Sequence, residues 1–204
     1  MRVLLVNGPP RSGKDTVGRL ICEGSPLATG VTKLKASAVV VPLLQTRKFS
    51  APLRRAMRDM FAWDITKVEH EKDQKKIHGR TPREIMIALS EQFFKPTFGP
   101  AFMGVELSRR LKIYAERESY GDAFGVVVTD SGFLEEIQPV LDTFPGEVRL
   151  LQMSRNGCTF EGDSRQYITP PEGCPVFKVD NNGSFEHLRI AVQDQRQWLL
   201  GAWD

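Results

Sequence analysis

The sequence predicts an α/β protein in which helices cover both faces of a mostly parallel sheet. Short apolar runs alternate with segments of helical pattern along the chain, as they do in proteins of this class. The first run, residues 2–7, is apolar without alternation, which is typical of a strand buried on both faces. Residues 8–13 follow as a loop with glycine at each end, and a helix is expected at 14–22.

The remaining elements continue this alternation. Further strands are expected within residues 38–50 and at 124–130, 148–154 and 175–180. Helices are expected at 52–61, from 81 to about 95, and at 101–118, 134–141 and 184–200. The clearest helix start is Thr81-Pro82-Arg83-Glu84, a capping box with proline at the first helical position, and Ser184 is a candidate N-cap of the last helix.

The length of the chain suits one domain, residues 1–204, with a helical region at about 52–118 and a polar loop at about 155–173. Its 41% hydrophobic and 26% charged residues are ordinary for a globular protein with a buried core. The sequence has no apolar run long enough for a membrane span and no signal peptide at its start. We therefore expect a cytoplasmic protein with reduced thiols at Cys22, Cys158 and Cys174, a Cys158–Cys174 disulfide being the alternative. The net charge of +3 fits an anionic substrate without requiring nucleic acid.

The strongest motif is Gly8-Pro9-Pro10-Arg11-Ser12-Gly13-Lys14-Asp15-Thr16, which fits the pattern G-x-x-x-x-G-K between a strand and a helix. Glycines let successive amides turn inward around an anion, and the start of the helix favours negative charge. The lysine of this pattern reaches the β- and γ-phosphates. The motif predicts that ATP with Mg²⁺ is bound by Gly8, Pro10, Arg11, Ser12, Gly13, Lys14, Asp15 and Thr16, and the alternative is a purely structural turn.

Two carboxylates are candidates for magnesium binding and catalysis. Asp15 stands where the pattern usually has the serine or threonine that ligates Mg²⁺. A carboxylate there either binds the ion directly, binds it through water, or orients the acceptor. Asp130 closes an apolar strand at its carboxyl end, where open α/β sheets place their ligands. It is a candidate magnesium ligand or proton acceptor, or else it caps the next helix.

Five arginines are candidates for contacts with phosphate, because a planar guanidinium suits that group. Arg54 and Arg58 share one helix face and, with Arg83, suit a clamp on the acceptor phosphate; the alternative for them is a basic surface. Arg155 and Arg165 lie in the polar loop 155–173. They suit a lid that stabilises the transferring group, together with the catalytic candidates Lys14, Asp15 and Asp130. Alternatively, Arg165 only pairs with Asp163.

The run Arg-Ser-Gly-Lys-Asp-Thr at 11–16 resembles the phosphate loop of the P-loop deoxynucleoside monophosphate kinases of tailed phages, which include 5-hydroxymethyluracil DNA kinases. Residues 49–54, 60–64, 81–84, 126–130 and 180–184 resemble other segments of the same family. The resemblance implies a P-loop NTPase fold, a three-layer α/β/α sandwich with a small lid and acceptor-binding region at 155–173 and 52–118. Two segments depart from it: Gly132 stands where the family usually has arginine, and residues 90–96 differ from its commoner Gly-Thr-Glu version.

Three functions remain open from the sequence. The resemblance implies a kinase that uses ATP and Mg²⁺ to phosphorylate a (deoxy)nucleoside monophosphate. A second hypothesis is a DNA kinase for 5-hydroxymethyluracil bases, which the changed segment 130–132 and the basic segments 33–35, 47–48 and 54–58 suit. The third is a non-kinase ATP-binding switch or ATPase. We expect no membrane partner; a viral chain would act in the host cytoplasm, as a monomer or a homodimer.

Overall fold

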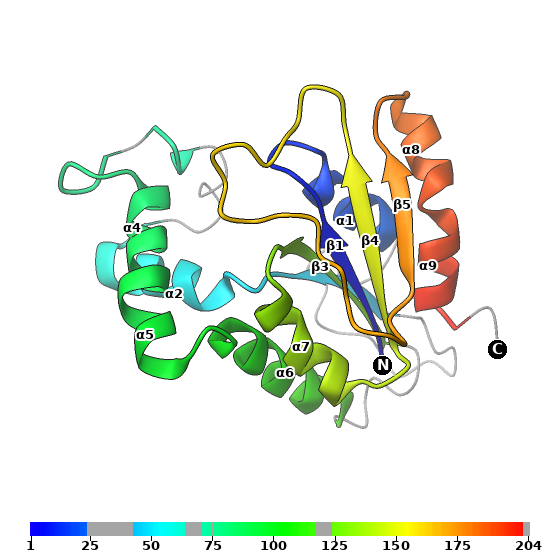
Figure 1. Ribbon diagram of the computed structural model, residues 1–204, viewed down its shortest axis with the longest axis horizontal. Helices are drawn as coiled ribbons and strands as arrows, with labels where there is room; N and C mark the ends of the chain where they lie inside the picture. The colour runs from blue at the N-terminus through cyan, green and yellow to red at the C-terminus, as the bar shows by residue number, and fades with distance from the viewer. Residues whose placement is uncertain (24–42, 64–70, 75, 117–123, 202–204) are drawn as a thin grey trace, which may run out of the picture.

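The computed structural model describes residues 1–23, 43–63, 71–74, 76–116 and 124–201 (Figure 1). Their strands form one five-stranded sheet in the order β2-β3-β1-β4-β5, and every neighbouring pair is parallel. The strands are β1 (Arg2–Asn7), β2 (Leu43–Arg47), β3 (Phe124–Ser131), β4 (Val148–Ser154) and β5 (Val176–Asp180). Helices lie on both faces, so the predicted α/β class with a parallel sheet is confirmed.

One face of the sheet is covered by helices from the two ends of the chain. These are α1 (Lys14–Cys22), α8 (Phe185–Ala191) and α9 (Gln193–Leu199), which flank the sheet in Figure 1. Successive strand residues point to opposite faces, so Leu4 and Val6 of β1 face this layer. They pack in one core cluster with Val17, Ile21 and Trp198.

The opposite face is covered by α2 (Ala51–Phe61), α6 (Phe102–Ala115) and α7 (Leu134–Thr143). Val3 and Leu5 of β1 point to this side and share a core cluster with Leu53, Leu107 and Ile137 from the three helices. Helices α6 and α7 approach closely at Gly104, where a Cβ atom would overlap the backbone of Glu136. A glycine is therefore needed at this crossing.

The helix that begins at the predicted capping box is longer and less regular than expected. Both hydrogen bonds of the box form between Thr81 and Glu84, which confirms the predicted start. The helix runs through α4 (Pro82–Ala88), the π-helical stretch η1 (Leu89–Phe94) and α5 (Lys95–Phe98) to Gly99. The predicted end near residue 95 was wrong because Pro96 lies in the first turn of α5, where the hydrogen-bond pattern changes and a missing amide donor costs least.

The chain ends in two short helices where one was predicted for 184–200. Ser184 caps α8 by accepting a hydrogen bond from the amide of His187, as expected. The helix then breaks at Val192, a fully buried residue with φ −102° and ψ 0°, before α9 begins. Leu188, Val192 and Trp198 face the same core cluster on both sides of the break.

Other predicted elements differ from the structure only at their ends. The predicted strand within 38–50 is β2, and the part of the prediction at 38–42 lies outside the described residues. The predicted helix 101–118 is α6, with residues 117–118 outside them as well. Cys22, Cys158 and Cys174 are unpaired. Among the described residues, no helix has the length and apolarity needed to cross a membrane.

Candidate functional site

Loop 8–13 lies at the carboxyl end of β1, the central strand. The loops that follow the other parallel strands reach the same edge, which is where open α/β sheets bind ligands. Arg11 has φ 65° and Gly13 has φ 99°, and the Ser12 amide donates a 3.3 Å hydrogen bond to the Pro9 carbonyl. The Ser12 hydroxyl is buried and has no hydrogen-bond partner among the described residues, so it can still form a hydrogen bond with a ligand in the loop.

The two glycines of this loop are fixed by close neighbours. A Cβ atom at Gly8 would lie 2.7 Å from the carbonyl oxygen of Met153, and one at Gly13 would overlap the side-chain amide of Asn181. The same amide donates a 2.8 Å hydrogen bond to the Ser12 carbonyl. Asn181 therefore supports the loop from the turn after β5. The sequence analysis missed this role, although Asn181 lies in a polar turn at the end of a strand.

Lys14 is folded back over the loop that precedes it. Its ammonium group donates hydrogen bonds of 2.7 Å to the carbonyl oxygens of both Gly8 and Pro9. Burial, and next the positive charge of Arg165, lower the pKa of Lys14 from 10.5 to about 8, and Asp15 is the largest opposing influence. The cation thus lies at the mouth of the loop, partly shielded from water.

Asp15, in the first turn of α1, lies between a hydroxyl and an ammonium group. The Thr129 hydroxyl donates a 2.6 Å hydrogen bond to its Oδ1 atom, and Lys48 Nζ lies 2.9 Å from the same oxygen. The Asp15 side chain is 55% exposed, so it still faces solvent. Thr129 and Lys48 were not predicted as partners of Asp15, because nothing in the sequence indicates that β3 and the segment after β2 lie next to the start of α1.

Asp130, at the end of β3, holds the start of α2. Its carboxylate accepts hydrogen bonds from the amide of Phe49 at 2.7 Å and from the amide and hydroxyl of Ser50 at 3.1 and 2.7 Å. Arg54 reaches the same corner, where its Nε donates a 3.1 Å hydrogen bond to the Ser50 hydroxyl. Asp130 therefore caps a helix about 80 residues earlier in the chain, whereas the helix after its own strand was the predicted alternative.

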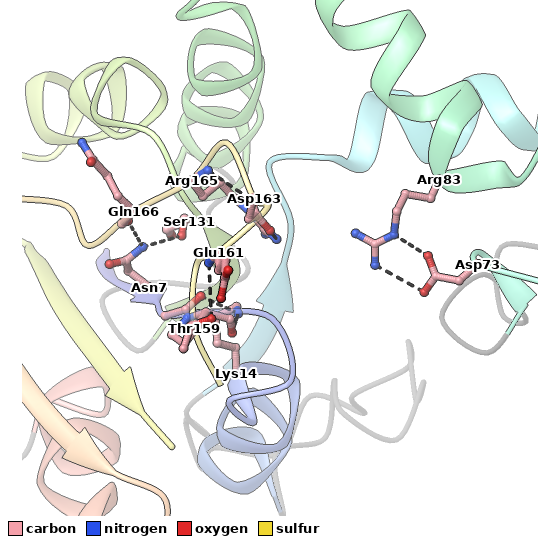
Figure 2. A network of polar contacts seen from close by, with 12 residues as sticks. Asn7, Lys14, Asp73, Arg83, Ser131, Thr159, Glu161, Asp163, Arg165 and Gln166 are labelled. Carbon is pink, nitrogen blue, oxygen red and sulfur yellow. Dashed lines mark hydrogen bonds and ion pairs between the residues drawn. The ribbon is translucent and has the colours of Figure 1, made fainter. Parts of the chain in front are cut away.

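Arg165 is held in place by Asp163, and its charge influences the pKa of Lys14. Its Nε atom donates a 2.8 Å hydrogen bond to Asp163, and its Nη2 atom makes a second one (Figure 2). This bonding lowers the pKa of Asp163 and raises that of Arg165. The stem of Arg165 lies on Gly132, where a Cβ atom would overlap it. The glycine at position 132 therefore makes room for an arginine from loop 155–173.

Loop 155–173 is tied to the sheet in its second half. The buried Asn7 side chain donates hydrogen bonds to the carbonyls of Ser131 at 3.0 Å and Gln166 at 3.1 Å, and it accepts one from the Ile168 amide at 3.1 Å (Figure 2). The Tyr167 hydroxyl donates a 2.9 Å hydrogen bond to the Met153 carbonyl. These contacts place Arg165 directly before an anchored segment.

A surface cavity of about 470 Å³ adjoins loop 8–13 on the side of β5. Its lining includes Gly13, Thr16, Arg155, Asn156, Asn182 and Phe185. Arg155 also reaches the loop itself, because its Nη1 atom lies 3.5 Å from the carbonyl oxygen of Arg11. The cavity therefore presents amide and guanidinium groups together with one exposed aromatic ring.

The three predicted acceptor arginines are not brought together. Arg54 lies at the corner with Asp130, whereas Arg58 is exposed and pairs with its neighbour Asp59 at 2.7 Å. Arg83 hydrogen-bonds Asp73, and Figure 2 shows that pair apart from Lys14, on the side of α4. The pKa of Asp73 is lowered first by this bond and more weakly by Arg11, so Arg83 and Asp73 lie within electrostatic range of the loop.

Glu136, in the first turn of α7, is a buried carboxyl group that the sequence analysis missed. It is 7% exposed, and burial raises its pKa to about 8, with a further contribution from the charge of Asp130. Lys95 and Arg165 oppose this shift. No sequence signal distinguishes it from the exposed Glu135, because only the packing of α7 on α6 decides which carboxylate is buried.

Within the described part of the chain, no three His, Cys, Asp or Glu side chains converge as they would in an all-protein metal centre. Compared with known proteins, the chain matches no protein-family model and no curated protein. A functional proposal for this chain therefore rests on the geometry of loop 8–13 and its surroundings.

Proposed function

We propose that the chain is an ATP-dependent P-loop kinase that transfers the γ-phosphoryl group to a nucleotide, with a (deoxy)nucleoside monophosphate as the favoured acceptor. The observation that carries the proposal is the Lys14 ammonium group folded over loop 8–13, at the start of α1 and at the carboxyl end of the central strand. Backbone amides, the helix dipole and a partly buried cation together favour a polyphosphate at this position.

The cavity beside the loop supports a nucleotide as the donor. With phosphates in loop 8–13, the ribose and base of ATP would extend past Thr16 into the space between Arg155 and Asn182. Side-chain amides supply donors and acceptors for a base edge, and a guanidinium group can stack on a base face. The exposed ring of Phe185 lies in the same cavity and provides a second flat surface.

Asp15 fits a magnesium ion that is shared with the phosphates. Mg²⁺ in nucleotide sites is held by one or two carboxylates, by phosphate oxygens and by water, and it neutralises negative charge on the transferring group. Asp15 follows Lys14 directly and is half exposed, so it meets this requirement. Both carboxylates already accept hydrogen bonds, but Asp130 fits less well as a direct ligand because it is less exposed than Asp15 and is bound to Phe49 and Ser50 by three of them.

Arg165 is the arginine best placed to stabilise the transferring phosphoryl group. Its guanidinium is held by Asp163 and influences the pKa of Lys14, so a phosphate in loop 8–13 would lie within electrostatic range of both cations. Preorganised charge of this kind stabilises a transition state without reorganising as the bond breaks. Arg155, which touches the loop backbone, provides a second cation from the same segment.

The role of Asp130 supports a phosphate acceptor over a hydroxyl acceptor. A nucleoside monophosphate attacks through a phosphate oxygen that is largely ionised at neutral pH, so it needs no general base. A hydroxymethyl group must lose its proton during the attack. The carboxylate at the end of β3 is engaged with Phe49 and Ser50, while Arg54 beside it offers a guanidinium to a phosphate.

The test offers radiolabelled ATP to free deoxynucleoside monophosphates, to DNA that contains 5-hydroxymethyluracil, and to no acceptor. We expect label in the nucleoside diphosphates. Label in the polymer would support the DNA kinase in its place, and label only in free phosphate would indicate an ATPase. Lys14→Ala is expected to abolish phosphoryl transfer without unfolding the chain. Turnover of ATP and acceptor by this variant would contradict the proposed mechanism.

Arg155→Ala tests the contribution of the loop after β4. We expect a large fall in kcat with a modest loss of ATP affinity, because the guanidinium acts mainly on the transferring group. Arg19→Ala is the matched control, since Arg19 is an exposed cation in the last turn of α1. An unchanged kcat in Arg155→Ala would exclude this role.

A further inference from the structure

A second cavity, of about 280 Å³, lies between the start of α2 and one face of α6. Its inner wall is apolar and is formed by Phe49, Leu107 and Leu111, which are all buried. It is lined by none of the residues of loop 8–13. Its volume lies just below the range of pockets that hold drug-sized molecules, which begins at roughly 300 Å³, so it suits a small ligand or part of a larger one.

Positive charge dominates the rim of this cavity. Four cationic side chains line it, namely Arg47, Lys48, Arg55 and Arg110. The one carboxylate in its lining, Glu106, lies 3.1 Å from Arg109 and 3.5 Å from Arg110. The pKa of Glu106 is lowered chiefly by its hydrogen bond to Arg109, so this carboxylate is already neutralised by its own helix. The cavity therefore offers more positive than negative charge to a ligand.

Two guanidinium groups repel each other across the rim. Burial, and then the positive charge of Arg55, lower the pKa of Arg110, so the two groups lie within electrostatic range in a place partly shielded from water. An anion between them would relieve this repulsion and would accept hydrogen bonds from both. Beside them, the Arg47 guanidinium lies 5.1 Å from the centre of the Tyr114 ring and presents a flat, cationic wall.

We propose that this cavity binds a phosphate group between Arg55 and Arg110, with the rest of the ligand against Tyr114 and the leucine wall. The phosphate belongs either to a free phosphorylated molecule such as a mononucleotide or to a phosphodiester of a single strand. The site is separate from loop 8–13 and does not depend on ATP binding there. Lys48 connects the two regions, since it lines the cavity and also pairs with Asp15.

The experiment titrates ¹⁵N-labelled protein with inorganic phosphate, thymidine monophosphate or a single-stranded oligothymidylate. The Nε–Hε resonances of Arg55 and Arg110, assigned from Arg55→Gln and Arg110→Gln, are expected to shift to saturation with at least one of these probes. The titration is repeated in Lys14→Ala, which removes the cation of loop 8–13. The same shifts are expected there, and their loss would place the anion in the loop and overturn the proposal.

Charge variants test whether the binding is local. Arg55→Gln and Arg110→Gln are each expected to weaken binding at least about tenfold, because each removes a charge-assisted hydrogen bond. Arg55 is exposed, so its variant keeps the fold even if Arg110→Gln does not. Lys112→Gln removes one charge from an exposed position of α6 outside the cavity lining and is expected to change affinity less than about twofold.

Equal weakening in Lys112→Gln, or resonances that do not move with any probe, would refute the site. Binding of phosphate or the mononucleotide as tight as that of the oligonucleotide would identify a free phosphorylated molecule as the ligand. Saturation with the oligonucleotide alone would identify the strand. Both of these last results support the cavity as a phosphate site.

Discussion

The charge of Arg165 influences two other titratable side chains near the carboxyl edge of the sheet. Lys14, Arg165 and Glu136 come from α1, from loop 155–173 and from α7. The charge of Arg165 lowers the pKa of Lys14 and opposes the rise in the pKa of Glu136. At the scale of single residues, two pH-dependent quantities test these pKa shifts: the affinity for ATP and the free energy of unfolding.

The first prediction concerns Lys14 and ATP. Its pKa of about 8 means that the free protein loses this positive charge as the pH rises above that value. The protonated form binds polyphosphate, so we expect ATP affinity to fall above pH 8, by up to about tenfold for each pH unit. Calorimetric titration between pH 7 and 9.5 measures this slope. In Lys14→Arg, whose guanidinium stays protonated, any binding should lack the slope, and equal slopes would contradict the prediction.

The second prediction concerns Glu136 and stability. Between pH 4.5 and about 8 the folded chain holds a proton on Glu136 that the unfolded chain has lost. The free energy of unfolding therefore falls with rising pH on account of this group. We expect Glu136→Gln to be more stable than the wild type by roughly 2–4 kcal/mol at pH 8, with little difference at pH 4.5. Urea unfolding at both values measures it.

The control for Glu136 is the preceding residue of the same helix turn. Glu135 is exposed, so Glu135→Gln removes the same charge without removing a buried carboxyl group. We expect its effect to be small and nearly independent of pH. A pH-independent difference for Glu136→Gln, or the same pH dependence in both variants, would show that burial of Glu136 does not control its protonation.

At the scale of secondary-structure elements, Asp130 connects β3 to α2. It holds the two residues that directly precede α2, through the backbone amides of Phe49 and Ser50 and the Ser50 hydroxyl. We expect Asp130→Asn to lower the free energy of unfolding by about 1–2 kcal/mol, because charge-assisted capping bonds are lost. Amide exchange should become faster at the start of α2. The proposed phosphoryl transfer should also slow, because Arg54 lies in the first turn of that helix.

Asp142→Asn is the matched control for this element. Asp142 is an exposed carboxylate on α7 that accepts a 2.8 Å hydrogen bond from Gln138. Its replacement should leave α2 unchanged and alter stability by less than about 0.5 kcal/mol. Unchanged exchange at the start of α2 in Asp130→Asn would mean that other contacts fix that helix.

At the scale of the whole molecule, the Asn7 side chain connects the central strand of the sheet to loop 155–173. Its amide bonds the carbonyls of Ser131 and Gln166 and accepts from the amide of Ile168, so one buried side chain connects β1, β3 and the loop. We expect Asn7→Ala to cost about 1–3 kcal/mol of unfolding free energy, since it leaves buried backbone groups unpaired. Amide exchange at 166–168 should accelerate more than in β1.

The comparison variant is Gln138→Ala, which removes an exposed side-chain amide from α7. It should change neither the stability nor the exchange of the loop by a measurable amount. If 166–168 stayed protected in Asn7→Ala, the anchoring would come from Tyr167 and Gln152, which also bond this segment.

Local patterns in the sequence were sufficient for most elements and for the motif of the site. Apolar runs predicted β1 and β3, and the capping box predicted the start of α4 at Thr81. They did not predict the π-helical stretch η1 or the break at Val192, because both depend on how a helix packs against its neighbours. Gly8, Gly13 and Lys14 could be identified as a candidate anion site, because their spacing occurs between a predicted strand and a predicted helix.

The partners of those residues come from distant parts of the chain. Asn181 supports Ser12 across 169 positions, and Asp130 holds the amide of Phe49 across 81. Arg165 lies on Gly132 because position 132 carries no side chain. Sequence spacing encodes contacts within one turn or one strand, whereas these pairs depend on the order of the strands in the sheet. The strand order depends on how the helices bury both faces of the sheet together. Residues from the complete chain take part in that packing.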